Sequence, residues 1–280
     1  MKKLRWKMFG WSMVLPVLAA GQFTALAAEG EPVPRVRQNF DAGWRFLKGD
    51  PEGAEQPAFD HSSWRSLDLP HDWSIEGPYD PRNPSGASGG YLPCGTGWYR
   101  KSFKLPQEGD GRRVFIEFDG VSMNGEVWSN GHRLGIRPYP YLGYEYELTP
   151  FLQAGKENVI AVRVDNTRQP ASRWYTGSGI YRHVWLTTTG PVRVAHWGTQ
   201  VSTPEVGEAR ARVKVVTTLD SGHQEPETLA VRQTILGADG AAVASVTGEL
   251  EARPGKANKL EQELGLENPL RWSPDSPTLY

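Results

Sequence analysis

Cysteine is nearly absent from this chain: Cys94 is the only one in 280 residues, so no disulfide can form within it. An excess of charge of one sign is lacking too, because 31 basic and 32 acidic residues give a formal net charge of −1. That balance provides no basic surface for nucleic acid or an anionic membrane. Beyond the leader described below, no apolar run approaches the roughly 20 residues of a membrane-spanning helix. A neutral ligand is therefore favoured.

Sequence motifs for metal, phosphate and nucleophilic chemistry are also missing. The six histidines form no His-Glu-x-x-His motif, and no phosphate-binding loop occurs, so we expect neither metal nor cofactor. Residues 86–90, GASGG, satisfy the G-x-S-x-G pattern of a nucleophile elbow. An elbow requires a strand before it and a helix after it, whereas proline and glycine lie on both sides here. We therefore expect no nucleophile at Ser88.

The first 28 residues have the pattern of a secretory signal peptide. Residues 8–20 are mostly apolar and the triplet Ala25-Leu26-Ala27 suits a cleavage site. The preceding positive region consists of Lys2, Lys3, Arg5 and Lys7. The pattern predicts export to the periplasm or the exterior. Residues 29–38 are polar and proline-containing, without periodicity, and predict a flexible lead.

What the chain does contain indicates an all-β protein, with 31 glycines, 22 prolines and 11 tryptophans. Residues 113–119, RVFIEFD, are rich in strand formers, and residues 158–166, NVIAVRVDN, place Ile160, Val162 and Val164 on one face. Asn130-Gly131 predicts a type I′ hairpin turn, which needs positive φ at both centres. Short strands with turns between them predict a sandwich or jelly roll over residues 39–190.

A second β unit is expected over residues 191–280. Residues 209–219, ARARVKVVTTL, alternate strictly, with Val213 and Val215 on one face, and residues 229–236 repeat the pattern before the turn GADG. The alternation predicts an antiparallel sheet with one wet face. An immunoglobulin-like sandwich has roughly 100 residues, which is more than residues 191–280 provide. We therefore expect this second sandwich to be truncated.

The stretch SRWYTGSGIYRHVWL, residues 172–186, gathers aromatic and cationic side chains around a Gly-Ser-Gly turn. Sugars are held by the apolar faces of aromatic rings and by hydrogen bonds to their hydroxyls. The stretch therefore predicts a sugar site, with these candidates: Arg173, Trp174, Tyr175, Tyr181, Arg182 and His183. The alternative is structural: Trp174, Tyr181 and Trp185 would anchor the core, and Arg173 and Arg182 would pair with backbone carbonyls or Asp165.

A second stretch, His71-Asp72-Trp73, favours a structural loop over a catalytic one. Asp72 follows a histidine, but in a loop closing on Pro70 and Trp73 it is expected to accept hydrogen bonds from backbone N–H groups. Trp73 is expected to pack against the core.

Six motifs in order resemble the amino-terminal half of glycoside hydrolase family 2, which includes β-galactosidases, β-glucuronidases and β-mannosidases. They are LPHDWSIEG (69–77), GTGWYRKSF (95–103), FDGVSMNGEVWSNGHRLG (118–135), AGKENVIAVRVDN (154–166), SRWYTGSGIYRHVWL (172–186) and LRWSPDSPTLY (270–280). The resemblance implies a galactose-binding-like jelly roll, an immunoglobulin-like sandwich and then a TIM barrel with two catalytic glutamates. Among the branches of the family, the β-galactosidase-like branch has motifs that most resemble these.

The chain departs from the family pattern at the positions of catalytic and sugar-contacting residues. No Asn-Glu dipeptide, which carries the family's acid/base glutamate, occurs in the sequence, so we assign no catalytic residue and expect the barrel to be absent. An aspartate that reaches galactose hydroxyls in some β-galactosidases is replaced by His183. A loop asparagine of the same enzymes would fall near Cys94 or Gly95, so the resemblance does not carry that contact over to this chain.

Two functions remain open. The first is the non-catalytic amino-terminal part of an exported β-galactosidase-like hydrolase, with a β-linked carbohydrate and the missing barrel as partners. The resemblance also allows a homo-oligomer of the intact enzyme. The second is a free-standing carbohydrate-binding or interaction module.

Overall fold

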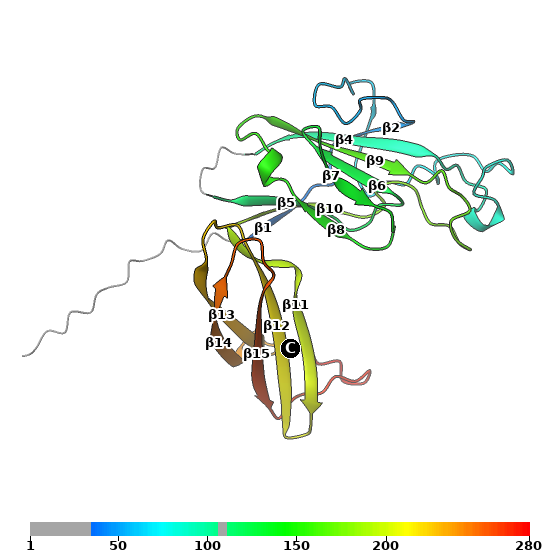
Figure 1. Cartoon of the computed structure of the whole chain (residues 1–280). Helices are drawn as coiled ribbons and strands as arrows, with labels where there is room; N and C mark the ends of the chain where they lie inside the picture. Colours follow the sequence, from blue (N-terminus) through cyan, green and yellow to red (C-terminus); the bar gives the residue numbers. More distant parts are fainter. Residues whose placement is uncertain (1–34, 106–110) are drawn as a thin grey trace, which may run out of the picture. The chain divides into compact units, whose positions relative to one another are not determined.

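The computed structural model describes residues 35–105 and 111–280, and in that part the chain is built from β-strands and two short 3-10 helices (Figure 1). The all-β prediction is confirmed. The predicted leader, residues 1–28, lies outside the described residues. None of the described helices is long and apolar enough to cross a membrane.

The first sandwich consists of two antiparallel sheets (Figure 1). One sheet has the order β1 (Val36–Asn39), β10 (Val184–Thr189), β5 (Arg113–Phe118) and β8 (Tyr144–Glu147). The other has the order β3 (Arg65–Leu67), β2 (Trp44–Lys48), β4 (Thr96–Lys104), β9 (Glu157–Asp165), β6 (Gly125–Ser129) and β7 (His132–Arg137). The 3-10 helices are η1 (Ala87–Gly89) and η2 (Thr149–Phe151). Non-consecutive strands are neighbours in both sheets, as in a jelly roll.

The main core lies between these two sheets. Ile160, Val162 and Val164 of β9 are buried in it, as the period-two pattern predicts. The opposite face of β9 is also covered, because Ala161 belongs to a second cluster in which Trp98 and Trp128 stack at 5.2 Å. Alternation alone does not show that a sheet is buried on both faces.

The predicted flexible lead, residues 29–38, is wrong at its end. Residues 36–39 form β1, an edge strand that pairs with β10 from Val36 opposite Thr188 to Asn39 opposite Trp185. All four side chains of β1 are exposed. The strand is held by backbone hydrogen bonds and by Arg37, which pairs with Glu117 and lies over the ring of Trp185, so no hydrophobic pattern predicts it.

The predicted turn at Asn130-Gly131 is confirmed. Asn130 has φ 48° and Gly131 has φ 81°, and the pair joins β6 to β7. The Asn130 side chain also donates to the carbonyl of Phe151 at 2.8 Å, and its oxygen accepts from the backbone N–H of Val159 at 2.8 Å. The turn thus also ties η2 and β9 together.

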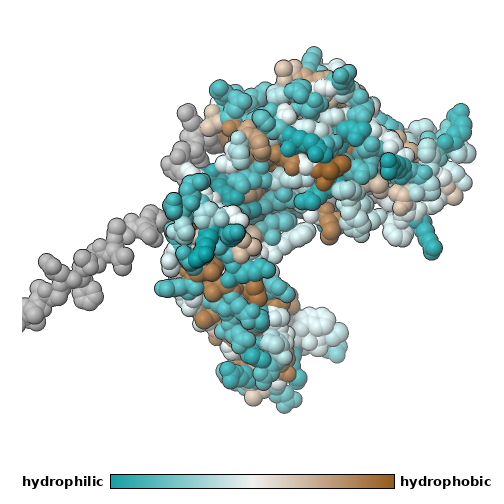
Figure 2. Space-filling model, in the orientation of Figure 1, coloured by the Kyte–Doolittle hydropathy of each residue, from teal (hydrophilic) through white to brown (hydrophobic). Residues whose placement is uncertain are grey.

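The second sandwich pairs a three-stranded with a two-stranded sheet. The first has the order β11 (Val192–Val206), β12 (Arg210–Ser221) and β15 (Asn258–Glu267); the second joins β13 (Glu227–Leu236) to β14 (Ala242–Ala252). Val213, Val215 and Leu264 form its small core. A groove of about 770 Å³ lies open between the sheets, and apolar residues show at the surface of this sandwich in Figure 2.

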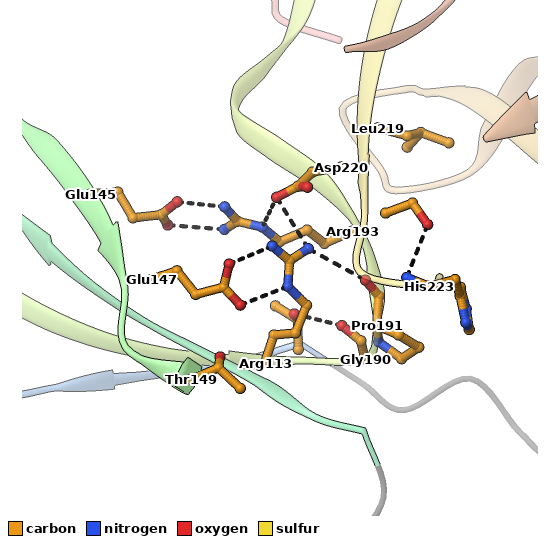
Figure 3. Close-up of polar contacts among 12 residues, drawn as sticks. Arg113, Glu145, Glu147, Thr149, Gly190, Pro191, Arg193, Leu219, Asp220 and His223 are labelled. Carbon is orange, nitrogen blue, oxygen red and sulfur yellow. Dashed lines mark hydrogen bonds and ion pairs between the residues drawn. The ribbon is translucent and has the colours of Figure 1, made fainter. Parts of the chain in front are cut away.

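An ion-pair network joins the start of β11 and the end of β12 to β5 and β8 of the first sandwich (Figure 3). Arg193 donates two hydrogen bonds to Glu145, at 3.0 and 2.6 Å, and both side chains are more than nine-tenths buried. Arg113 pairs with Glu147 at 2.7 Å and with Asp220 at 3.2 Å. The hydrogen bond to Glu147 raises the pKa of Arg113 above its ordinary value. The guanidinium of Arg193 also packs over Phe115, 3.4 Å from the ring centroid, so it is held by charge and by stacking.

Candidate functional site

The aromatic loop, residues 172–183, lies directly before β10. Backbone hydrogen bonds tie the second half of this loop to the first sandwich. His71 donates its N–H to the carbonyl of Ile180 at 2.8 Å, and Trp73 donates to Ser178 at 3.2 Å. Ser122 and Gly179 exchange two hydrogen bonds of 2.9 Å. Ile180 is completely buried in the main core. The half of the loop around residues 178–180 is therefore a rigid base.

Gly179 occupies a position that only glycine fits. Its φ is 109°, a region that side chains rarely adopt. A Cβ there would lie 2.2 Å from the hydroxyl oxygen of Tyr99 and 2.9 Å from the carbonyl oxygen of His71. The glycine thus lets the loop approach the segment at residues 71–73 closely.

Asp72 organises the loop through hydrogen bonds to the backbone. One carboxylate oxygen accepts from the N–H groups of Ser74 and Ser178, both at 3.0 Å, and the other accepts from the hydroxyl of Tyr175. Burial, together with the Asp72 carboxylate, raises the pKa of Tyr175 above its ordinary value. Tyr175 therefore stays a neutral donor. Trp73 beside Asp72 is buried and stacks on Phe46 at 5.7 Å.

His71 lies buried beneath the loop. Its Nδ1 is 2.7 Å from the hydroxyl of Tyr99, and its Nε2 is 3.3 Å from Glu76, which in turn pairs with Arg65. Burial lowers the pKa of His71, and the nearby Glu76 only partly offsets that effect. His71 is thus a neutral member of the scaffold at pH 7.

The lowered pKa of His71 makes stability depend on pH. The unfolded imidazole takes up a proton more readily than the folded one, so this contribution is complete above the unfolded pKa of about 6.5 and is lost as pH falls through it. We expect the free energy of unfolding, measured with urea from about pH 8 to about pH 5, to decrease less in His71→Gln than in the wild type. The same substitution at exposed His132 should retain the wild-type decrease. Equal slopes in all three proteins would contradict the assignment.

Trp174 and Tyr181 lie against the segment at residues 138–143, between β7 and β8. The indole N–H of Trp174 donates to the hydroxyl of Tyr141 at 2.7 Å, and the hydroxyl of Tyr181 donates to the carbonyl of Pro140 at 2.7 Å. Trp174 is 59% exposed. The structural alternative that makes Trp174 a core anchor is therefore wrong, because its ring lies on the surface with only its N–H tied down.

His183 contacts a different part of the molecule. Its Nδ1 lies 2.7 Å from a carboxylate oxygen of Asp41, whose other oxygen accepts from the N–H of Val184 at 2.8 Å. Burial of Asp41 works against ionisation, but these hydrogen bonds and one from Asn39 outweigh it and lower its pKa. Asp41 therefore holds the imidazole by Nδ1, and the side chain of His183 remains about half exposed.

The remaining candidates, Arg173 and Arg182, are exposed. The suggested pairing partner Asp165 is occupied otherwise: it lies 3.4 Å from Arg163 and accepts from the N–H and hydroxyl of Thr167. The structure thus brings Trp174 and Tyr181 to one segment and places His183 at another.

The loop borders a cavity of about 10 Å³, which accommodates one water molecule and no sugar. Cys94 lines this cavity, and burial raises the pKa of its thiol above the ordinary value, which disfavours the reactive thiolate. Among the described residues no group of three or more potential metal ligands occurs. The loop is therefore an open surface, with cations and rings available for hydrogen bonding and stacking.

Two side chains that bind the candidates of the aromatic loop were not themselves candidates: Tyr141, the partner of Trp174, and Asp41, the partner of His183. The aromatic run RPYPYLGYEY, residues 137–146, could have pointed to Tyr141. Nothing in the sequence pointed to Asp41, which lies 142 positions before His183.

Comparisons with known proteins agree on one family. Residues 90–190 match the sugar-binding domain model of glycosyl hydrolases family 2, and residues 192–280 match a second model of that family. A β-galactosidase of Bacteroides ovatus is 49% identical over 88% of this chain, and a β-glucuronidase of Formosa agariphila is 30% identical over 88%. The chain spans 29% and 27% of the length of these relatives.

Solved structures give the same result. A glycosyl hydrolase family 2 member from Bacteroides cellulosilyticus has a TM-score of 0.80 and 34% identity, covering 86% of this chain and 32% of that one. A β-glycosidase from Bacteroides vulgatus has a TM-score of 0.77 and 37% identity, covering 87% and 30%. With its jelly-roll and immunoglobulin-like sandwiches, this chain belongs to glycoside hydrolase family 2, of which it represents the amino-terminal domains.

Proposed function

We propose that this chain is the non-catalytic amino-terminal part of an exported, β-galactosidase-like glycoside hydrolase. The observation that carries the proposal is the exposed aromatic and cationic loop before β10, held on a rigid base within a family 2 sugar-binding domain. The 49% identity to a β-galactosidase, of which this chain spans 29%, favours that substrate class and a larger enzyme. The leader pattern of residues 1–28 supports export.

The chemistry of the proposed enzyme is retaining hydrolysis by two carboxyl groups about 5 Å apart, supplied by a barrel outside this chain. In this chain the exposed ring of Trp174 offers an apolar face for the C–H surface of a pyranose. Arg173, Arg182 and His183 provide hydrogen bonds to hydroxyls. His183, held by Asp41, stands where some β-galactosidases of the family have an aspartate, so its contact carries less negative charge.

Hydrolysis of nitrophenyl β-galactoside tests this proposal. We expect no activity from the chain alone and activity when it is mixed with the separately expressed remaining portion of the Bacteroides ovatus relative. That portion by itself is the control. Activity of the chain alone would contradict the absence of catalytic carboxylates. No activity in any mixture, together with galactoside binding by the chain, would favour a free-standing carbohydrate-binding module.

Substitution of Trp174 by alanine separates a sugar contact from a packing role. Because the ring is exposed, we expect the melting temperature to fall by no more than about 2 °C. We expect galactoside affinity, measured by NMR titration of the active mixture, to weaken about fivefold. Trp272→Ala is the matched control, since Trp272 is also 59% exposed but lies in the second sandwich. A large loss of stability with unchanged affinity would show a packing role for Trp174.

A further inference from the structure

Trp197 on β11 is exposed in a conformation that costs energy. Its φ is 51°, and it lies where the register between β11 and β12 shifts, between Val194 and Thr199. A residue with a side chain in the left-handed region costs on the order of 1–3 kcal/mol. Burial does not offset this cost, because 70% of Trp197 is exposed. The conformation projects an indole ring outward at a cost to stability, which is typical of a functional position.

The ring of Trp197 is supported from one side by His196. The two rings stack with centroids 4.5 Å apart and an angle of 30° between their planes. His196 is four-fifths buried, and its Nδ1 lies 4.0 Å from carboxylates of both Glu117 and Glu145. The imidazole is thus a fixed support beneath an exposed indole.

Trp197 borders a groove of about 440 Å³, a volume in the range of small-molecule sites, which runs from about 300 to 1,000 Å³. Tyr139 and Leu142 also line it, and they are 59% and 58% exposed. The polar lining includes Arg137, whose guanidinium lies 5.8 Å from the ring centroid of Tyr146 and has no carboxylate at ion-pairing distance in the described part of the chain. The groove thus combines ring faces with a guanidinium able to donate hydrogen bonds.

A row of aromatic rings connects this groove with the Trp174 loop. Tyr139 meets Tyr141 edge to face, with centroids 5.5 Å apart, and the hydroxyl of Tyr141 accepts from the indole N–H of Trp174. The rings belong to residues 138–143, the aromatic loop and β11, which are distant in sequence. An elongated row of rings suits an elongated ligand whose units each have an apolar face.

We propose that the groove between Tyr139 and Trp197 binds an oligosaccharide. Its sugar rings stack on the two aromatic faces, and its hydroxyls accept hydrogen bonds from Arg137. The near-neutral chain and the family's sugar-binding domain favour a neutral oligosaccharide over a nucleic acid or a strongly acidic ligand. This groove goes beyond the proposed hydrolase function, because this chain alone supplies it and it requires no catalytic barrel.

Calorimetric titration of the chain with a β-linked galactan oligosaccharide and with galactose tests the proposal. We expect the oligosaccharide to bind. Galactose should bind much more weakly, because one sugar unit can stack on only one of the two aromatic side chains. Trp197→Ala and Tyr139→Ala should each weaken oligosaccharide binding about tenfold. Trp197→Phe, which keeps an aromatic face, should retain most of it, and Trp272→Ala should leave it unchanged. Melting temperatures of all variants show whether each remains folded.

Absence of oligosaccharide binding by the wild-type chain would overturn the proposal. So would unchanged binding in folded Trp197→Ala and Tyr139→Ala. If these variants instead impaired only the reconstitution of activity with the barrel portion, the groove would be a contact between domains and the proposal would be wrong. Failure of the wild-type chain to bind the oligosaccharide would leave the hydrolase proposal standing, because that proposal depends on activity in the mixture.

Discussion

Replacement of Arg193 by methionine is expected to lower the free energy of unfolding by about 3–5 kcal/mol. Glu145, whose side chain is 6% exposed, would lose both hydrogen bonds to its guanidinium partner and remain a buried carboxylate with only His196, 4.0 Å away, beside it. The guanidinium that packs over Phe115 would be lost as well. Urea unfolding at pH 7, followed by tryptophan fluorescence, measures the change.

Two controls identify the cause of that loss. Arg212→Met removes an ion pair with Glu263 in which both side chains are over 40% exposed, and it should cost at most about 1 kcal/mol. The double variant Arg193→Met/Glu145→Leu should be more stable than Arg193→Met alone, because no buried charge is left without a partner. If Arg193→Met cost no more than Arg212→Met, the buried pair would not contribute as argued.

Substitution of Gly179 by alanine is expected to cost about 2–5 kcal/mol, from backbone strain together with steric overlap. The new methyl group would lie 2.2 Å from the Tyr99 hydroxyl oxygen, and Tyr99 is fully buried and cannot move aside. The hydrogen bonds that Gly179 exchanges with Ser122 would lengthen. We therefore expect the base of the aromatic loop to shift and the galactosidase activity proposed for the reconstituted mixture to fall. Urea unfolding and nitrophenyl β-galactoside hydrolysis measure the two effects.

Gly43→Ala separates strain from overlap. Gly43 has a comparable positive φ of 74°, but a Cβ there meets no atom within 4 Å. That variant should lose only about 1 kcal/mol and keep its activity in the mixture. Equal losses at both positions would show that the close approach at Gly179 contributes nothing.

The sequence predicted the all-β architecture because local patterns carry that information. Asn130-Gly131 encodes its own turn through the positive φ that both residues tolerate, and residues 209–219 place Val213 and Val215 toward a core by alternation alone. β1 was missed because its side chains are exposed and its hydrogen bonds to β10 bridge residues about 150 positions apart. Such a pairing leaves no local signal.

The candidate site was predicted in part. The aromatic stretch at residues 172–186 was evident from its composition, and the surface position of its loop follows from the exposed ring of Trp174. Its neighbours were not evident, because Tyr141 and Asp41 come from other strands or loops and become partners only when the sheets pack.

The sequence by itself determined the strand-rich fold class, the turns and the family, since each is expressed in alternation, in glycine and asparagine positions or in contiguous motifs. Only the tertiary structure decided which charges are buried together, as for Arg193 and Glu145, and which rings face solvent, as for Trp174 and Trp197. The physical reason is that burial and pairing depend on segments distant in the chain, whereas hydrophobic period and turn propensity depend on neighbours.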